Sequence, residues 1–469
     1  MAEIGGTVVA EATGAVPVDR PRPGVAEVDP GRWWATARAV LAEAVARAGR
    51  PPGSYAGLTA SSLRQGYVLT DGTNELGAAV LNSDRRGAGE LDRLRREVGV
   101  GALYATTGHW PAPELTLPKL LHLARTEPGL WAATRRVLFV HDWVLWRLSG
   151  EEVTEASYAS AGQMADVARR RWAGELLDGL GLGTARLAPL MEAGATVGHL
   201  ADAGLGLPLG LPVVAGGGDT QLAAMGSGGL ADGVITVVAG SSTPVQAAAS
   251  APPEDPQRHP WVSTHLAPDR WAVETNAAYP GTMLGWLAGV QRCGIDELWL
   301  RAATSAPGAN GVTAVVAAPA WTEEAWVARA PNTVLGMTPS TTEADLARAF
   351  VEAHAYAIRA NVVDLERVLG RPAARLVVTG GAARGGSLPH LVADVLGRDV
   401  LVPATTQPAA RAGAALVGQA CGIGTGADGL VPGTGELVPA GDPAPYDEPY
   451  QRYLAAHAAL RAHLPEPAG

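Results

Sequence analysis

The amino-acid sequence predicts an α/β protein of two domains. Its 469 residues are enough for two domains, or three, at ~100–200 residues each. Hydrophobic residues make up 47% of the chain, which supplies large cores and excludes global disorder. Short apolar strands alternate with longer amphipathic helices, and this alternation begins again after residues 226–233. We therefore expect the domain boundary there.

Composition excludes several classes of protein. The net charge of −10 argues against a nucleic-acid scaffold or a basic membrane-surface protein. Two cysteines, Cys293 and Cys421, cannot form a disulfide framework, which indicates a reducing compartment. Lys119 is the only lysine and follows a proline, so the chain has neither a P-loop nor the lysine of a protein kinase. With no run of ~18 apolar residues, we expect a soluble cytoplasmic protein.

The first half is predicted to open with a helix that Asp29 caps, that has Pro30 at its first position and that Gly49 ends. A three-stranded β-meander should follow, with an Asp71-Gly72 turn before its last strand. Its strands are expected at residues 55–60, 66–70 and 76–81, and helical segments at 118–124 and 140–148. The half ends with a buried strand at 211–218 that runs into a turn of three glycines.

The second half alternates strands and helices. Its clearest element is a helix over residues 343–369, with a capping box from Ser340 and Glu343 or from Thr342 and Asp345, and Gly370 after its end. Strands are expected at 234–239, 271–275, 312–317, 376–379 and 400–402, and helices at 281–288, 388–396 and from 409. A Pro/Gly-rich connector at 424–445 leads to a last helix at 450–464. The G-x-G-x-x-G at 424–429 precedes no helix, so we interpret it as a loop.

A lone carboxylate follows the buried strand 211–218. Asp219 stands directly after Gly216-Gly217-Gly218, at the end of a strand where open α/β sheets bind ligands. It could accept a proton from a substrate hydroxyl, or it could merely cap a helix that begins at Thr220. His141-Asp142 has the composition of a catalytic dyad or metal pair, but adjacent helix residues do not face each other, so we expect neither.

Two further strands end in glycine-rich loops. Gly240-Ser241-Ser242 can present N–H groups and hydroxyls to a phosphate, although an ordinary β-turn has the same composition. The segment 380–386 contains four glycines, which would let a base or ribose approach the backbone. In the first half, Arg64 faces the segment 82–85 across a hairpin, where a guanidinium could hold a polyol or simply be solvated.

The order of these signals resembles the FGGY family of carbohydrate kinases, over residues from about Gly6 to Gly422. The matching motifs are Glu27-Val28-Asp29-Pro30 with Trp33-Trp34, Leu117-Pro118-Lys119-Leu120, Arg147-Leu148-Ser149-Gly150, Gly380-Gly381-Ala382-Ala383-Arg384, 391–397 and 412–415. The resemblance implies two actin-like (ribonuclease H-like, hexokinase-type) ATPase domains around a central cleft. Residues 1–228 would bind the sugar, 229–425 would bind ATP, and 426–469 would be a connector and C-terminal helix.

The resemblance also implies an ATP- and Mg²⁺-dependent kinase for a small sugar or polyol, such as a ketopentose, a pentitol or an autoinducer-2-like compound. Asp219 would be the general base, and Arg64, Gln65, Asp219 and Thr220 would hold the substrate. Gln65 stands where autoinducer-2 kinases have Glu, which leaves the substrate open. ATP would lie on Gly240, Ser241, Ser242, Gly380, Gly381, Ala382 and Gly385. Neither nucleic acid nor membrane is expected as a partner, and a homodimer is left open.

The N-terminus departs from the family pattern. Members begin with an Asp-x-Gly-Thr loop whose Asp helps to hold Mg²⁺, and Glu3-Ile4-Gly5-Gly6-Thr7 imitates it only superficially. We therefore expect that about 15–20 residues are missing and that the start codon is misplaced, and we assign no metal ligand, although Asp219 lies nearby. The alternatives are a variant with weak or no phosphoryl transfer that binds sugar or nucleotide without catalysis, and, less favoured, an actin-like structural ATPase.

Overall fold

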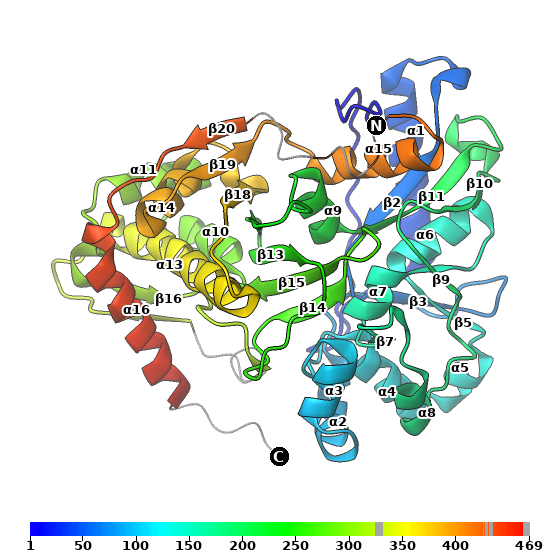
Figure 1. Ribbon diagram of the computed structural model, residues 1–469, viewed down its shortest axis with the longest axis horizontal. Helices are drawn as coiled ribbons and strands as arrows, with labels where there is room; N and C mark the ends of the chain where they lie inside the picture. Colours follow the sequence, from blue (N-terminus) through cyan, green and yellow to red (C-terminus); the bar gives the residue numbers. More distant parts are fainter. Residues whose placement is uncertain (324–331, 425, 427–429, 431–434, 463–469) are drawn as a thin grey trace.

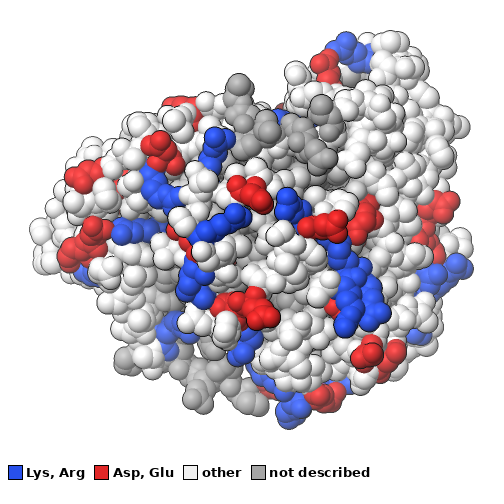
Figure 2. Space-filling view, in the orientation of Figure 1, with Lys and Arg blue, Asp and Glu red and all other residues white. Residues whose placement is uncertain are grey.

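The two halves of the chain form two lobes that lie side by side (Figure 1). The computed structural model describes residues 1–323, 332–424, 426, 430 and 435–462. In this part of the chain, no helix is long and apolar enough to cross a membrane. On the face shown in Figure 2, acidic and basic side chains are interspersed.

The first lobe contains two small sheets. One has the order β1 (Glu27–Val28), β4 (Ala79–Val80), β3 (Tyr67–Thr70) and β5 (Arg136–Phe139), with antiparallel pairs throughout. The other has the order β10 (Thr196–His199), β11 (Pro212–Gly218) and β2 (Leu58–Ser62). The remaining short strands are β6 (Thr154–Glu155), β7 (Ala165–Asp166), β8 (Arg171–Trp172) and β9 (Leu190–Met191).

Two expectations about these strands are wrong. β2 does not join a meander with β3 but pairs in parallel with β11, which lies far along the chain. Pairing between neighbours in sequence is only a tendency, and here the apolar strand β11 provides the better partner. Gly216, Gly217 and Gly218 form the end of β11 rather than a turn. That end has no room for side chains, because it lies against β2, Leu266 and Arg64 in turn.

The helices of the first lobe surround these sheets. The predicted first helix is α1 (Pro30–Ala48): Asp29 accepts the Arg32 N–H, Gly49 ends the helix in the left-handed conformation, and Trp34 is buried. The other helices are α2 (Leu91–Glu97), α3 (Val100–Thr107), α4 (Thr116–Thr126), α5 (Pro128–Ala133), α6 (Val140–Ser149), α7 (Ala156–Ala161), α8 (Gly174–Gly179) and α9 (Asp219–Gly226).

Among the described residues, seven strands form the main sheet of the second lobe. Their order is β14 (Trp261–Thr264), β15 (Trp271–Asn276), β13 (Pro244–Ala249), β12 (Val234–Val238), β18 (Arg375–Thr379), β19 (Val400–Pro403) and β20 (Gly435–Val438). The central pairs β12–β18 and β18–β19 are parallel. β16 (Thr313–Val315) and β17 (Thr333–Leu335) form a separate hairpin. β20 lies in the segment that we predict to be a connector.

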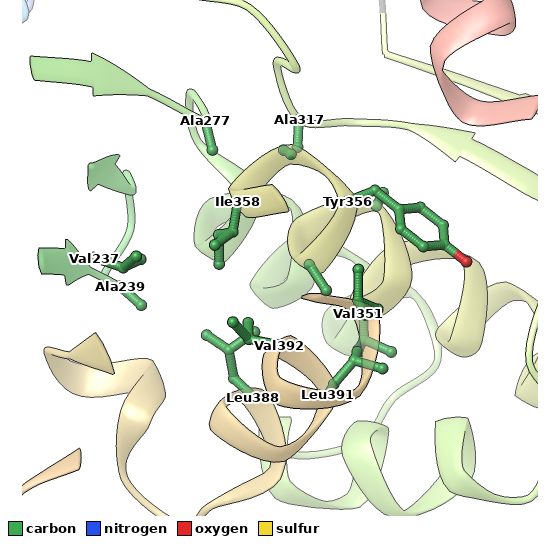
Figure 3. Packing of buried hydrophobic residues seen from close by; sticks show 14 of the residues in the cluster. Val237, Ala239, Ala277, Ala317, Val351, Tyr356, Ile358, Leu388, Leu391 and Val392 are labelled. Carbon is green, nitrogen blue, oxygen red and sulfur yellow. The ribbon is translucent and has the colours of Figure 1, made fainter. Parts of the chain in front are cut away.

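The core of the second lobe forms around α13 (Glu343–Leu369), whose bounds match the prediction. In Figure 3, Val351 and Ile358 of α13 lie close to Leu388, Leu391 and Val392 of α14 (Ser387–Leu396). The other helices of this lobe are α10 (Pro280–Val290), α11 (Ile295–Ala303) and α16 (Ala444–Ala462). α15 (Pro408–Ala420) returns to the first lobe, where it packs against α9, β2 and β11. Most of the G-x-G-x-x-G at 424–429, and the end of the predicted last helix beyond residue 462, fall outside the described residues.

The capping box of α13 yields a stability prediction. The Thr342 hydroxyl accepts the Asp345 N–H at 3.2 Å, and the Asp345 carboxylate accepts the Thr342 N–H at 2.9 Å. Thr342→Ala should lower the free energy of unfolding by ~1 kcal/mol, because it exposes an unpaired helix N–H. Urea denaturation followed by circular dichroism measures this. Ser340→Ala removes the other candidate cap as a matched control, and an equal loss there would contradict the assignment.

Candidate active site

Asp219 is the first residue of α9 and follows the last glycine of β11. Its side chain is exposed, and Oδ1 accepts the Thr220 N–H at 2.6 Å and the Thr220 hydroxyl at 3.1 Å. Gly218 is the N-cap of α9, so Asp219 lies in the first turn of the helix and does not cap it, and its carboxylate is accessible. Asp219 forms no ion pair within the described part of the chain, so its charge is available to a ligand.

Arg64 reaches from the end of β2 to the other lobe. Its Nη2 donates to Glu274 Oε1 on β15 at 2.9 Å, and the two side chains are only 10% and 4% exposed. A Cβ on Gly218 would lie 2.9 Å from Arg64 Cγ, so the arginine stem crosses the residue before Asp219. Burial disfavours the guanidinium cation, but Glu274 and then Asp219 outweigh it and raise the pKa of Arg64. Arg64 and Asp219, both predicted site residues, therefore lie together.

Sequence reasoning missed Glu274 and Gln246. Gln246 lies on β13 and donates to the second carboxylate oxygen of Glu274, so the buried acid is held from two sides. A signal was available, since a charged residue stands in the middle of the apolar strand 271–276. A buried carboxylate among apolar neighbours needs a cationic or hydrogen-bonding partner, and Arg64 is that partner here.

The backbone carbonyl of Gln65 is bound by side chains of the first lobe. Its φ is +63°, and its carbonyl accepts from Lys119 Nζ at 2.9 Å and from the Thr116 hydroxyl at 3.1 Å. Lys119 is fully buried on α4 and also donates to the Leu81 carbonyl at 2.9 Å. Burial lowers the pKa of Lys119 to about 7. The only lysine thus clamps the turn that carries Arg64, a role that the sequence alone did not reveal.

The segment 82–86, which was expected to lie across the hairpin from Arg64, forms buried polar contacts within the first lobe. Asp84 is buried, accepts the Ala26 N–H at 2.7 Å and pairs with Arg86, which also bonds Glu27 at 2.5 Å. Arg86 therefore stabilises the packing of β1 against β4.

His141 and Asp142 differ from our expectation, because their side chains do meet. His141 Nδ1 lies 2.9 Å from Asp142 Oδ1, and both side chains are fully buried.

The two predicted nucleotide loops are joined. They follow β12 and β18, which are parallel neighbours, so both end at the same edge of the sheet. The Ala239 N–H donates to the Thr379 carbonyl at 2.7 Å, and the Ala382 N–H donates to the Ala239 carbonyl at 3.0 Å. Gly380 has a φ of +96°, and a Cβ there would lie 2.4 Å from the Ala239 oxygen, so only glycine fits.

The start of α10 lies against Gly240-Ser241-Ser242. A Cβ on Gly281 would come 2.0 Å from the Gly240 oxygen, and the Thr282 N–H donates to the Ser241 carbonyl at 3.3 Å. Ser241 is exposed and Ser242 half-buried. An exposed hydroxyl loop beside a helix N-terminus favours the binding of an anion. The sequence did not indicate that Gly281 was needed for this contact.

A cavity of about 390 Å³ opens beside the second loop. Gly380 and Gly385 line it, whereas Gly381 and Ala382, which we also expected there, do not. Glu436 of β20 also lines it, in a segment that the sequence analysis assigned to a connector. The other lining residues are Thr379, Ala383, Arg384, Gly386, His390, Val402, Pro403, Thr405 and Thr406.

Within the described ranges, no three His, Cys, Asp or Glu side chains are placed to hold a metal ion.

The N-terminal segment forms a tight turn in which the Glu3 N–H donates to the Thr7 carbonyl at 2.9 Å. A Cβ on Gly6 would lie 2.6 Å from Arg411 Cγ on α15, so this turn packs against that helix. Residues 1–4, β2 and α15 line a second cavity, of about 460 Å³.

Comparison with known proteins gives consistent relatives. A model of the FGGY family of carbohydrate kinases, N-terminal domain, matches residues 2–226, and the model of its C-terminal domain matches residues 235–420. The autoinducer-2 kinase of Yersinia enterocolitica is 30% identical over 436 residues, which cover 89% of this chain and 81% of the relative. The autoinducer-2 kinase of Salmonella paratyphi A is 29% identical with the same coverage.

Solved structures agree with these matches. The xylulose kinase from Rhodospirillum rubrum is 28% identical, with a TM-score of 0.82 over 95% of this chain and 93% of that one. The ligand-bound xylulose kinase from Lactobacillus acidophilus is only 17% identical but has a TM-score of 0.89 over 99% and 96%, which shows the same fold.

The ion pair between the lobes yields a second prediction. Glu274→Gln should lower the free energy of unfolding by about 3 kcal/mol, because it leaves the Arg64 cation buried without its countercharge. Thermal and urea unfolding measure this. The matched control is Glu448→Gln, which breaks a largely exposed pair with Arg452 and should change the stability by less than ~0.5 kcal/mol. Equal effects would mean that the Arg64 pair is solvated.

Proposed function

The chain belongs to the FGGY family of carbohydrate kinases, and we propose that it transfers the γ-phosphoryl group of ATP to a hydroxyl of a ketopentose, a pentitol or an autoinducer-2-like compound, with Asp219 as the general base. Carbohydrate phosphorylation with ATP follows from the family. The choice of substrate and the roles of individual residues are the proposal. The observation that supports the proposal is the position of Asp219, an exposed carboxylate beside the buried Arg64 at the junction of the lobes.

We assign ATP to the second lobe, within residues 229–425. The adenosine would occupy the 390 Å³ cavity along Gly380 and Gly385, and the phosphates would lie on Gly240, Ser241 and Ser242, next to the N-terminus of α10. Gly381 and Ala382 support this loop through the Ala382–Ala239 hydrogen bond. Backbone N–H groups and hydroxyls suit an anionic ligand there.

We assign the sugar to the first lobe, within residues 1–228, where Arg64 and Thr220 flank Asp219. The guanidinium has further N–H donors beyond the one that bonds Glu274, and these suit substrate hydroxyls. Gln65 would act through its backbone position rather than its side chain, since its carbonyl is held by Lys119. Residues 426–469 would take no part in the chemistry, apart from Glu436 at the adenosine cavity.

In the reaction, a substrate hydroxyl oxygen attacks the γ-phosphorus as its proton passes to the Asp219 carboxylate. The new O–P bond forms while the bond from the γ-phosphorus to the bridging oxygen breaks, and ADP leaves with that electron pair. The enzyme mainly positions the two partners and neutralises phosphate charge. Closure of the lobes would exclude water from the γ-phosphate.

Magnesium would arrive with the nucleotide. Because the described residues provide no cluster of three metal-ligating side chains, phosphate oxygens and water would supply most of its ligands. Asp219 is the carboxylate best placed to contact the magnesium ion.

We expect the enzyme in the cytoplasm, where ATP is available and the free thiols of Cys293 and Cys421 stay reduced. We do not favour a non-catalytic binding protein, because Asp219 and both nucleotide loops are retained.

Asp219→Asn should lower kcat by ~10³-fold or more, since an amide cannot take the proton. The Kd for ATP should stay within about twofold of the wild-type value. Coupled ADP release with a panel of ketopentoses, pentitols, glycerol and the autoinducer-2 precursor measures the first, and calorimetry the second. Asp232→Asn, at an exposed surface position, is the matched control. Full activity of Asp219→Asn would contradict the general-base assignment.

Gly380→Ala should raise the KM for ATP about tenfold or more and leave the KM for the sugar unchanged, because the new Cβ collides with the Ala239 oxygen. Initial rates with each substrate varied separately measure this. Gly370→Ala has a similar positive φ of +67° but open space around its Cβ, so it controls for backbone strain alone. An unchanged KM for ATP in Gly380→Ala would place the nucleotide elsewhere.

A further inference from the structure

We propose that His141 is a positioning residue for the reaction, an imidazole that holds the irregular end of β11 and thereby orients Asp219. This inference rests on the proposed role of Asp219 as the base. It gives a purpose to the His141-Asp142 pair, which the sequence singled out and which the mechanism above does not use.

β11 contains one residue more than its partner strand at this point. Val214 pairs with Thr59, and the next pair joins Gly217 to Ser61, so three steps along β11 match two along β2. A bulge of this kind removes a backbone group from the regular ladder and re-aims the residues that follow. The N–H group of Gly216 is freed, and it donates to His141 Nε2 at 3.0 Å.

The protonation of the imidazole is set by its other partner. His141 Nδ1 lies 2.9 Å from Asp142 Oδ1, so a proton on Nδ1 donates to the carboxylate and leaves Nε2 free to accept from Gly216. Asp142 Oδ1 also accepts the Glu155 N–H at 3.3 Å. Both side chains are fully buried. His141 therefore contacts no substrate and acts only through the backbone that it holds.

The His141 ring also contacts the residue that holds the end of β2, which is Tyr158. Tyr158 of α7 stacks on His141 with centroids 4.8 Å apart and planes 13° from parallel. The Tyr158 hydroxyl accepts the Ser62 N–H at 3.1 Å and donates to the Ser62 carbonyl at 3.1 Å. Ser62 ends β2, two residues before Arg64. One imidazole thus connects the segment that carries Arg64 with the segment that carries Asp219.

The titratable groups in contact with the ring are Asp142 on α6 and Tyr158 on α7. Glu155, Asp219 and Arg64 lie beyond them, as charges that act on Asp142 or Tyr158. Burial raises the pKa of Asp142, with the hydrogen bond from His141 opposing. Burial raises the pKa of Glu155 to about 8, opposed by Ser157. A cationic imidazole would turn Nε2 into a donor facing another donor, so the arrangement requires the neutral ring.

The test compares His141→Leu, which removes the acceptor, with His141→Gln, whose amide oxygen can accept from Gly216. His141→Leu should lower kcat about 100-fold, as expected for a misplaced catalytic group, with the KM for ATP unchanged. It should also speed amide hydrogen exchange in the peptide that spans residues 212–220. His141→Gln should restore both properties to within about fivefold. His457→Leu removes a buried histidine of the second lobe as a control.

Asp142→Asn provides a variant that keeps the shape of the site. In this variant the amide oxygen can take the place of Oδ1 and accept from His141 Nδ1 and from the Glu155 N–H, so the tautomer is kept. The kcat, the exchange at 212–220 and the melting temperature should therefore all stay near the wild-type values. Faster exchange without a loss of kcat in His141→Leu would overturn the inference, and so would unchanged exchange at 212–220. If Asp219→Asn keeps full activity, the base assignment fails separately, because the exchange measurement does not depend on it.

Discussion

β11 approaches β2 and Arg64 so closely that no side chain fits between them. A Cβ on Gly216 would lie 1.9 Å from the Ala60 oxygen, and one on Gly218 would lie 2.9 Å from Arg64 Cγ. Gly216 and Gly218 satisfy this constraint, and Gly217 between them lies against Leu266, at an entropic cost that most strands avoid. The position of Asp219, the stem of Arg64 and the hydrogen bond from Gly216 to His141 all depend on it.

An ion pair joins the two lobes near Asp219. Parallel strands β12 and β18 bring two glycine loops to one edge of the second lobe, while β2 and β11 bring an arginine and a carboxylate to the end of the first. The Arg64–Glu274 pair connects them where both side chains are almost fully buried. A buried pair contributes little to net stability, but it fixes geometry because either charge alone would be costly. Such a contact aligns a site whose two halves lie on different lobes.

Much of this organisation could be predicted from local signals. The capping box and Gly370 determined both ends of α13. Strand–glycine patterns placed Asp219 after β11 and the two glycine loops after β12 and β18, as the structure has them. Apart from the contact between the adjacent His141 and Asp142, the errors share one physical cause, which is contact between distant parts of the chain. β2 pairs with β11 rather than β3. Glu274, Lys119 and His141 acquire their roles only through partners that lie 210, 54 and 75 positions away. Local propensity contains no information about such partners.

Lys119 has a consequence beyond the turn that it holds. Because it is the only lysine and is fully buried, the folded chain offers no side-chain amine to solvent. Amine-directed acylation, crosslinking or immobilisation of the native protein would find no lysine to react with. When the packing of α4 against β3 and β4 loosens, this amine reaches solvent, and its pKa returns towards the ordinary lysine value because burial no longer lowers it. Labelling of one residue would therefore count the molecules whose first lobe has opened.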